Sequence, residues 1–88
     1  MRVSYRKNFL KELAKIPSGT RKRIEKFVFK QLPKTNSIFE IVIVEQMKGY
    51  RSCYKVRFGS YRIGLKIENG AVILERALHR KDIYRYFP

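Results

Sequence analysis

The chain has 88 residues, of which 21 are Lys or Arg and only 7 are Asp or Glu, so its formal net charge is +14. This length predicts one domain, residues 1–88, with a single modest core, and it excludes a second lobe or a large cofactor-binding region. The charge exceeds what solubility requires and predicts a polyanionic partner, but charge alone does not choose among RNA, DNA, a ribosomal surface, an anionic membrane and an acidic protein.

The cysteine count and the distribution of apolar residues argue against disulfides, zinc clusters, membrane spans and a signal peptide. Cys53 is the single cysteine, so no intramolecular disulfide or zinc cluster can form, and we expect it to be a small hydrophobic or half-exposed residue of a strand. No segment approaches the roughly 20 apolar residues of a membrane span, and the opening MRVSYRKNFL lacks the apolar stretch of a signal peptide. We therefore expect a cytoplasmic protein that uses no membrane, metal or cofactor.

The N-terminal half predicts a strand and two helices. Residues 2–5 are typical of a short strand. Apolar residues spaced by three and four then mark one face of a helix, namely Phe9, Leu10, Leu13 and Ile16. After the break at residues 17–19, a second helix over residues 20–32 carries a buried stripe of Ile24, Phe27, Val28 and Leu32, and Pro33 ends it. The two helices form a hairpin whose apolar stripes need a sheet to cover them.

The C-terminal half predicts a sheet. Residues 34–49 indicate a loop with a short strand, because residues 41–44 are strand-like but do not alternate. Alternating apolar and polar residues then predict strands over 53–58, 61–68 and 71–78, joined by tight turns at Gly59-Ser60 and Asn69-Gly70. The predicted fold class is α+β, in the order β-α-α-β-β-β, with the helical hairpin packed on a small twisted antiparallel sheet.

The first tight turn fixes a register that gathers positive charge. A two-residue loop at Gly59-Ser60 pairs Arg57 with Arg62 and Lys55 with Gly64. Like charges directly opposite one another destabilise a sheet, so we expect an anion between the two arginines. Gly64 opposite Lys55 predicts open space that a backbone or a base can enter.

The second tight turn extends this register to the last strand. It pairs Leu65 with Leu74 and Gly64 with Glu75, and it places Ile73, Glu75, Ala77 and His79 on the polar face with the arginines. Arg76 then falls on the apolar face, unless a β-bulge turns it outward or it snorkels at the sheet edge.

Six candidate site residues crowd into the last third of the chain: Lys55, Arg57, Arg62, His79, Arg80 and Tyr84. An ordinary solvent-facing strand also carries Lys and Arg, so a single such residue indicates little. Several that converge across one hairpin favour a site for an RNA phosphate.

Four short motifs resemble the RelE/ParE superfamily of bacterial and archaeal toxins. They are Met47-Lys48-Gly49, the CYKVR run at 53–57, Tyr61-Arg62, and the LHRKDIY run at 78–84. The resemblance implies an endoribonuclease that cuts mRNA in the ribosomal A site, beside the 16S rRNA. It also implies a cognate acidic antitoxin, in a toxin–antitoxin heterotetramer. Positions similar to the catalytic ones are Lys55, Arg57, Arg62, Arg80 and Tyr84, but Arg80 precedes Tyr84 by a shorter spacing than in the best-known RelE toxins.

RNA cleavage through the adjacent 2′-OH needs no metal if the site supplies a base, a charge clamp and an acid. Arg57 and Arg62 are the expected clamp, because a guanidinium binds phosphate bidentately and stays protonated. Lys55 is the expected base, since neighbouring positive charge favours its neutral form.

The remaining roles are assigned to the end of the chain. His79 titrates nearest neutrality and is the candidate proton donor to the leaving oxygen, although a lone histidine at a strand end is also commonly structural. Tyr84 stacks on a base or orients the nucleophile, or else packs in the core. Glu45 and Glu75 are fallback bases.

Two other functions fit the same fold. The ParE branch poisons DNA gyrase without cutting nucleic acid, and such toxicity should survive loss of Lys55. A detoxified remnant would bind RNA with a steep salt dependence and cut nothing.

Overall fold

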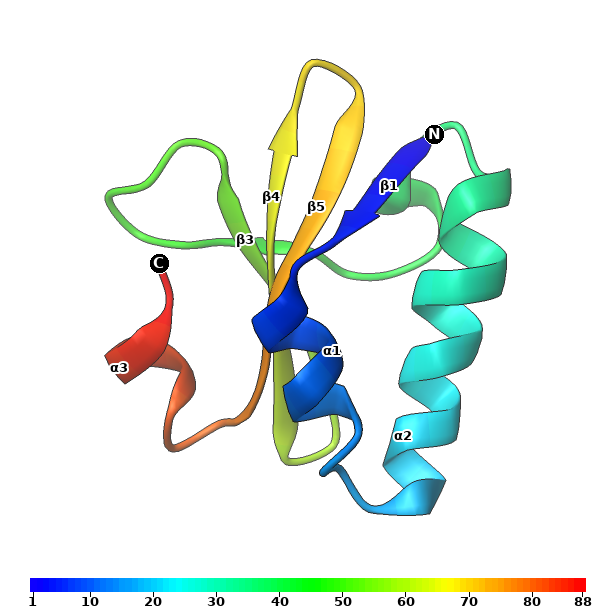
Figure 1. The fold of residues 1–88 in the computed structure, drawn as a ribbon. Coiled ribbons are helices and arrows are strands. Elements are labelled where there is room, and N and C mark those ends of the chain that lie inside the picture. The colour runs from blue at the N-terminus through cyan, green and yellow to red at the C-terminus, as the bar shows by residue number, and fades with distance from the viewer.

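The computed structural model describes residues 1–88 and builds one five-stranded sheet, in the order β1-β5-β4-β3-β2 (Figure 1). The strands are β1 (Arg2–Tyr5), β2 (Glu45–Gln46), β3 (Cys53–Phe58), β4 (Tyr61–Glu68) and β5 (Ala71–His79). The hairpins β3–β4 and β4–β5 are antiparallel, as predicted. β1 instead runs parallel to β5, so the prediction of a wholly antiparallel sheet is wrong at this edge. A parallel partner is reached through a long crossover, and strand patterning does not reveal it.

Two helical segments cover one face of the sheet. α1 (Lys7–Leu13) buries Phe9 and Leu13, as the spacing predicts, but Leu10 is 43% exposed, and its predicted place on the buried stripe is wrong. α2 (Ser18–Glu25) continues without a break into a π-helical stretch (Lys26–Gln31) and a 3₁₀ turn (Leu32–Lys34). The helix predicted over 20–32 is therefore present, with a wider second half.

Tyr5 of β1 fastens the π-helical stretch. The N–H of Leu32 donates to the carbonyl of Phe27, five residues back. In the same pattern the carbonyl of Val28 would need the N–H of residue 33, which is a proline and has none. The hydroxyl of Tyr5 supplies the missing donor at 2.6 Å, and β1 is thereby tied to the helix.

The main core lies between these helices and the sheet. Fourteen buried side chains form it: Phe9, Leu13, Ile16, Ile24, Phe27, Val28, Leu32, Ile38, Val56, Ile63, Leu65, Val72, Leu74 and Ala77. This confirms the predicted stripe of the second helix and the predicted apolar face of the sheet. None of the helices combines the length and the apolar character needed to cross a bilayer.

A short C-terminal helix, α3 (Ile83–Tyr86), was not predicted. It packs on the opposite face of the sheet, where Met47, Cys53, Ile83 and Phe87 form a second small cluster. Figure 1 shows α2 and α3 on opposite sides of the strands. Cys53 is buried there, as the small hydrophobic residue that was expected, and burial raises the pKa of its thiol.

A β-bulge alters the register of β5. Leu65 pairs with Leu74 as predicted, but Gly64 pairs with Arg76 rather than with Glu75. The bulge turns Arg76 out of the apolar face, which was one of the two expected solutions. Glu12 of α1 holds it there by accepting hydrogen bonds from the Arg76 side chain at 2.5–3.1 Å and from the Ala77 N–H at 3.0 Å. Because the pairing shifts by one residue, Ala77 enters the main core, and its predicted place on the polar face is wrong.

The segment between the helices and β3 is mostly irregular, as predicted. It contains a 3₁₀ turn (Ile38–Glu40) and the two-residue strand β2, in which Glu45 pairs with Lys55. Ile43 is 85% exposed, so the apolar run at 41–44 is not the strand itself but the loop that leads into it.

Candidate active site

The basic residues of the β3–β4 hairpin lie on the sheet face opposite the main core. Arg57 pairs directly with Arg62, and Lys55 pairs with Gly64, as predicted. Arg57 is exposed, whereas Lys55 and Arg62 are half-buried. The observed salt bridges leave all three residues without a carboxylate partner. The like charges across this hairpin thus form no ion pair with a carboxylate of the chain.

α3 brings Tyr84 to this face. The Lys55 ammonium hydrogen-bonds the Tyr84 hydroxyl, and its Nζ lies 4.4 Å from the centre of the ring. Tyr84 stays 66% exposed. α3 is seated by Phe87, whose ring lies only 2.7 Å from where a Cβ on Gly64 would stand. The open space predicted at Gly64 is therefore filled by Phe87, and that prediction is wrong.

Arg62 is the most constrained of the basic residues. Its Nη1 donates to the carbonyls of Gly59 at 2.8 Å and Tyr61 at 3.0 Å. Burial lowers the pKa of Arg62, and the charges of Arg57 and Arg80 lower it further, while Glu45 acts in the opposite sense. Arg80 therefore belongs to the same charged neighbourhood. We call Lys55, Arg57, Arg62 and Arg80 the basic cluster.

Arg80 is held beside the hairpin by its backbone. Its N–H donates to the carbonyl of Ser60 at 2.8 Å, in the turn that joins β3 to β4. This bond ties the backbone of Arg80 to the β3–β4 turn.

The model of a family described as the ParE toxin of type II toxin–antitoxin systems, parDE, matches residues 3–84. The chain is also 39% identical to toxin RelE3 of Methanocaldococcus jannaschii over the full length of both proteins. The chain belongs to the RelE/ParE superfamily of type II toxins. Within it, the toxin is RelE-like, and the predicted superfamily is confirmed.

One solved structure agrees with this assignment, and a more distant one shares the fold. The crystal structure of the RelB–RelE antitoxin–toxin complex from Methanococcus jannaschii is 38% identical, with a TM-score of 0.83 over 97% of this chain and 99% of that one. The RelBE2 complex of Mycobacterium tuberculosis has a TM-score of 0.69 at 21% identity, over 90% of this chain and 96% of that one. The second likeness supports the α+β fold of the toxin.

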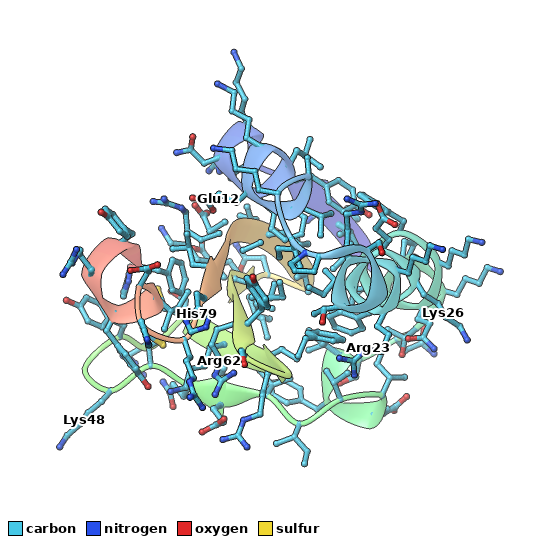
Figure 2. The ribbon with its side chains drawn as sticks, turned by 90° about the horizontal axis from the view of Figure 1, so that it is seen from below. Glu12, Arg23, Lys26, Lys48, Arg62 and His79 are labelled. Atoms are coloured by element: carbon cyan, nitrogen blue, oxygen red, sulfur yellow. The ribbon has the colours of Figure 1, made fainter.

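His79 does not face the basic cluster. The bulge pairs His79 with Tyr61, and their rings meet edge to face at 5.5 Å on the side of the sheet that the helices cover. Its Nδ1 accepts a hydrogen bond from the N–H of Lys81 at 3.2 Å. Figure 2 shows His79 and Arg62 at the same end of the sheet. The prediction that His79 shares the polar face with Arg62 is wrong, because it assumed a regular strand.

The two fallback carboxylates have different surroundings. Glu45 stands opposite Lys55, beside a hollow of about 430 Å³ that Arg57 and four apolar residues also line. Glu75 lies in the bulge, where it forms an ion pair with Arg6 at 3.5 Å. Only Glu45 therefore adjoins the basic cluster. No three His, Cys, Asp or Glu side chains converge anywhere in the toxin as metal ligands would.

Two supporting residues were missed from sequence. Ile83 and Phe87 are buried and hold α3 against the sheet, which is what carries Tyr84 to Lys55. The signal was present in their spacing of four, which places both on one face of a helical turn. A single turn is too short for this pattern to stand out.

Proposed function

We propose that this toxin is an endoribonuclease that cleaves mRNA in the ribosomal A site by attack of a 2′-OH on the adjacent phosphate, without a metal ion. The observation that carries the proposal is the pairing of Arg57 with Arg62 across β3 and β4, with no ion-paired carboxylate on either. Two guanidinium groups in this position fit a phosphate whose negative charge grows in the transition state.

The basic cluster and Tyr84 divide the chemical steps. Arg57 and Arg62 hold the scissile phosphate, and Lys55, positioned by the Tyr84 hydroxyl, takes the proton of the 2′-OH. Arg80 neutralises the charge that develops on the leaving 5′ oxygen, which takes a proton from water to become the 5′-hydroxyl of the downstream fragment. The ring of Tyr84 is exposed and offers a surface on which a base can stack.

The placement of His79 supports a need for the ribosome. The ring of His79 lies against Tyr61, so no imidazole faces the basic cluster. Removal of the proton from the 2′-OH therefore depends on lysine and tyrosine. Such a site gains most from a substrate that another surface has already oriented. Action on the ribosome also places the toxin in the cytoplasm.

The decisive experiment is primer extension on an mRNA translated in a cell-free system with added toxin. Arg62→Ala and Lys55→Ala should each slow cleavage at A-site codons by about 10²–10³-fold, the usual loss when one group that stabilises the transition state is removed. Arg2→Ala is the matched control, because Arg2 is an exposed arginine of β1, at the opposite edge of the sheet. Undiminished cleavage by Arg62→Ala would refute the proposed site.

The products report on the chemistry. Attack by the 2′-OH leaves a 5′-hydroxyl on the downstream fragment, whereas a metal-activated water that expels the 3′ oxygen leaves a 5′-phosphate. We expect a 5′-hydroxyl. A 5′-phosphate would reject both the proposed base and the absence of a metal.

Inhibition of DNA gyrase is the second candidate, and the match to a ParE family model favours it. A gyrase poison would arrest growth with intact mRNA, and purified toxin would block DNA supercoiling. Arrest that persists in Lys55→Ala, together with uncut mRNA, would establish this alternative.

We further propose a cognate acidic antitoxin, in a heterotetramer with the toxin. The relative from M. jannaschii was crystallised with RelB. The charge of +14 and the exposed apolar residues Phe39, Ile41 and Ile43 offer both electrostatic and apolar contact. Light scattering on the co-expressed pair would give the stoichiometry, and a ratio other than two to two would contradict it.

A further inference from the structure

The helical rod formed by α2 and its continuation carries a row of lysines. They recur at every fourth position and all are exposed: Lys22, Lys26, Lys30 and Lys34. Glu25, the one acidic residue of the rod, is 4.0 Å from Arg21 and pairs with no lysine of the row. Like charges four residues apart destabilise a helix, so folding does not account for the row.

The π-helical stretch keeps this lysine row straight. In an α-helix of 3.6 residues per turn, a spacing of four overshoots the turn and a row drifts by about 40° at each step. In the π-helical stretch Lys26–Gln31 the hydrogen bonds span five residues and a turn holds more than four, so the step from Lys26 to Lys30 drifts the other way. The two offsets oppose, so Lys22, Lys26 and Lys30 lie about 6 Å apart along one side of the rod, whereas Lys34 belongs to the 3₁₀ turn that follows.

Arg23 joins the lysine row to the basic cluster. Its Nη2 lies 3.6 Å from where a Cβ of Gly59 would stand, and the Gly59 carbonyl accepts the hydrogen bond from Arg62. Figure 2 shows Arg23 between Arg62 and Lys26, with the Lys26 side chain directed into solvent, whereas Glu12 of α1 lies on the other side of the view from Arg62. The row therefore begins beside the turn of the β3–β4 hairpin, on the helical layer that covers the opposite face of the sheet from the basic cluster.

The residue types of the lysine row favour one class of polyanionic partner over an acidic protein and over single-stranded nucleic acid. Protein interfaces are depleted in lysine at their centres and need apolar contact, and Phe29 is the one large exposed hydrophobic residue of the rod. Sites for single-stranded nucleic acid interleave several aromatic residues with the charges, which the row does not. Evenly spaced point charges on a rigid rod suit phosphates held at a fixed spacing in a duplex.

We propose that the lysine row binds the phosphate backbone of a base-paired RNA, while the basic cluster takes the strand that is cut. The inference rests on the proposed action on RNA. It adds a second RNA contact, one that holds the toxin by shape and charge and reads no sequence.

The test compares two triple variants of equal net charge. The row variant is Lys22→Gln/Lys26→Gln/Lys30→Gln. The control is Lys7→Gln/Lys11→Gln/Lys15→Gln, three exposed lysines of the same spacing in and just after α1. Binding of a fluorescent RNA hairpin with a fully paired stem is measured against salt concentration, beside an unpaired RNA of equal length.

We expect the row variant to bind the paired hairpin about tenfold or more weakly near physiological salt, and to lower the slope of log affinity against log salt by about three, one for each lysine. The control should change little, and the unpaired RNA should lose less affinity than the hairpin. Equal losses in both variants would mean an effect of net charge and would overturn the proposal.

Two further outcomes separate the proposals. If the row variant keeps its hairpin affinity but no longer co-purifies with the co-expressed antitoxin, the row serves a protein and the inference is overturned. Hairpin binding requires no cleavage, so a wild-type toxin that needs the row for binding but cuts no mRNA would refute the nuclease and support the row.

Discussion

At the scale of single residues, hydrogen-bond partners explain features that no periodicity contains. The wide turn before Pro33 leaves the Val28 carbonyl without a backbone donor, and Tyr5 supplies one from another element. Burial also raises the pKa of Tyr5 from its ordinary value of 10.0. Tyr5 therefore joins β1 to the helical rod through one hydroxyl group.

Replacing Tyr5 by Phe should lower the free energy of unfolding by about 1–2 kcal/mol, because the Val28 carbonyl loses its donor in a half-buried position. Urea denaturation measures the loss. Tyr50→Phe is the control, since Tyr50 is 52% exposed and its hydroxyl makes no hydrogen bond within the chain. An unchanged midpoint in Tyr5→Phe would show that the bond contributes nothing.

The difference in stability between wild type and Tyr5→Phe should depend on pH. A tyrosine whose pKa is higher in the folded than in the unfolded chain contributes stability that is complete below pH 10 and is lost as the pH rises through the folded value. The stability difference between wild type and Tyr5→Phe should therefore shrink above about pH 10. A difference that grows there would contradict the raised pKa.

At the scale of elements, the position of α3 depends on a glycine of β4. A Cβ at Gly64 would stand 2.7 Å from the ring of Phe87, which anchors α3. α3 carries Tyr84 to Lys55. The absence of a side chain at Gly64 is therefore needed for Tyr84 to reach the candidate site.

Gly64→Ala should displace Phe87 and loosen α3, at a cost of about 1–3 kcal/mol for overpacking. Hydrogen exchange should become faster over residues 83–87, and RNA cleavage should fall although every residue of the basic cluster is unchanged. Gly19→Ala is the control, because no atom lies within 4 Å of the added Cβ. Unaltered exchange in Gly64→Ala would mean that α3 is held by other contacts.

Local sequence patterns predicted those elements whose partners are their neighbours in the chain. The tight turn at Gly59-Ser60 fixed the β3–β4 register residue by residue, which is why Lys55, Arg57 and Arg62 were placed correctly. The bulge at Glu75 depends on Glu12, a residue more than 60 positions away, so alternation alone placed His79 on the wrong face. Tyr84 was singled out by its place among the basic residues of the last third of the chain, but the helix that carries it was missed, since a helix of one turn has no clear periodicity.

At the scale of the whole molecule, net charge opposes folding. Seven acidic residues face 21 basic ones, and only three ion pairs form. Self-repulsion on this scale destabilises the compact state and is screened by salt.

The melting temperature should therefore rise as salt increases from low to moderate concentration, by about 4–8 °C for each 1 kcal/mol of relieved repulsion in a domain of this size. Calorimetry at several salt concentrations measures it. The two triple lysine variants should both show a smaller rise, because this effect depends on net charge and not on the position of the lysines. A melting temperature that falls with salt would mean that attractive ion pairs dominate.

The neighbouring positions of β1 and β5 set the order in which the chain can fold. Val3 pairs with Val72, so the first strand has no partner in the sheet until most of the chain has been synthesised. Closing so long a loop is slow compared with forming the helical hairpin or the β3–β4 hairpin. The helices and the β3–β4 hairpin can thus form while the sheet is still open, and we expect the pairing of β1 with β5 to be a late step of folding.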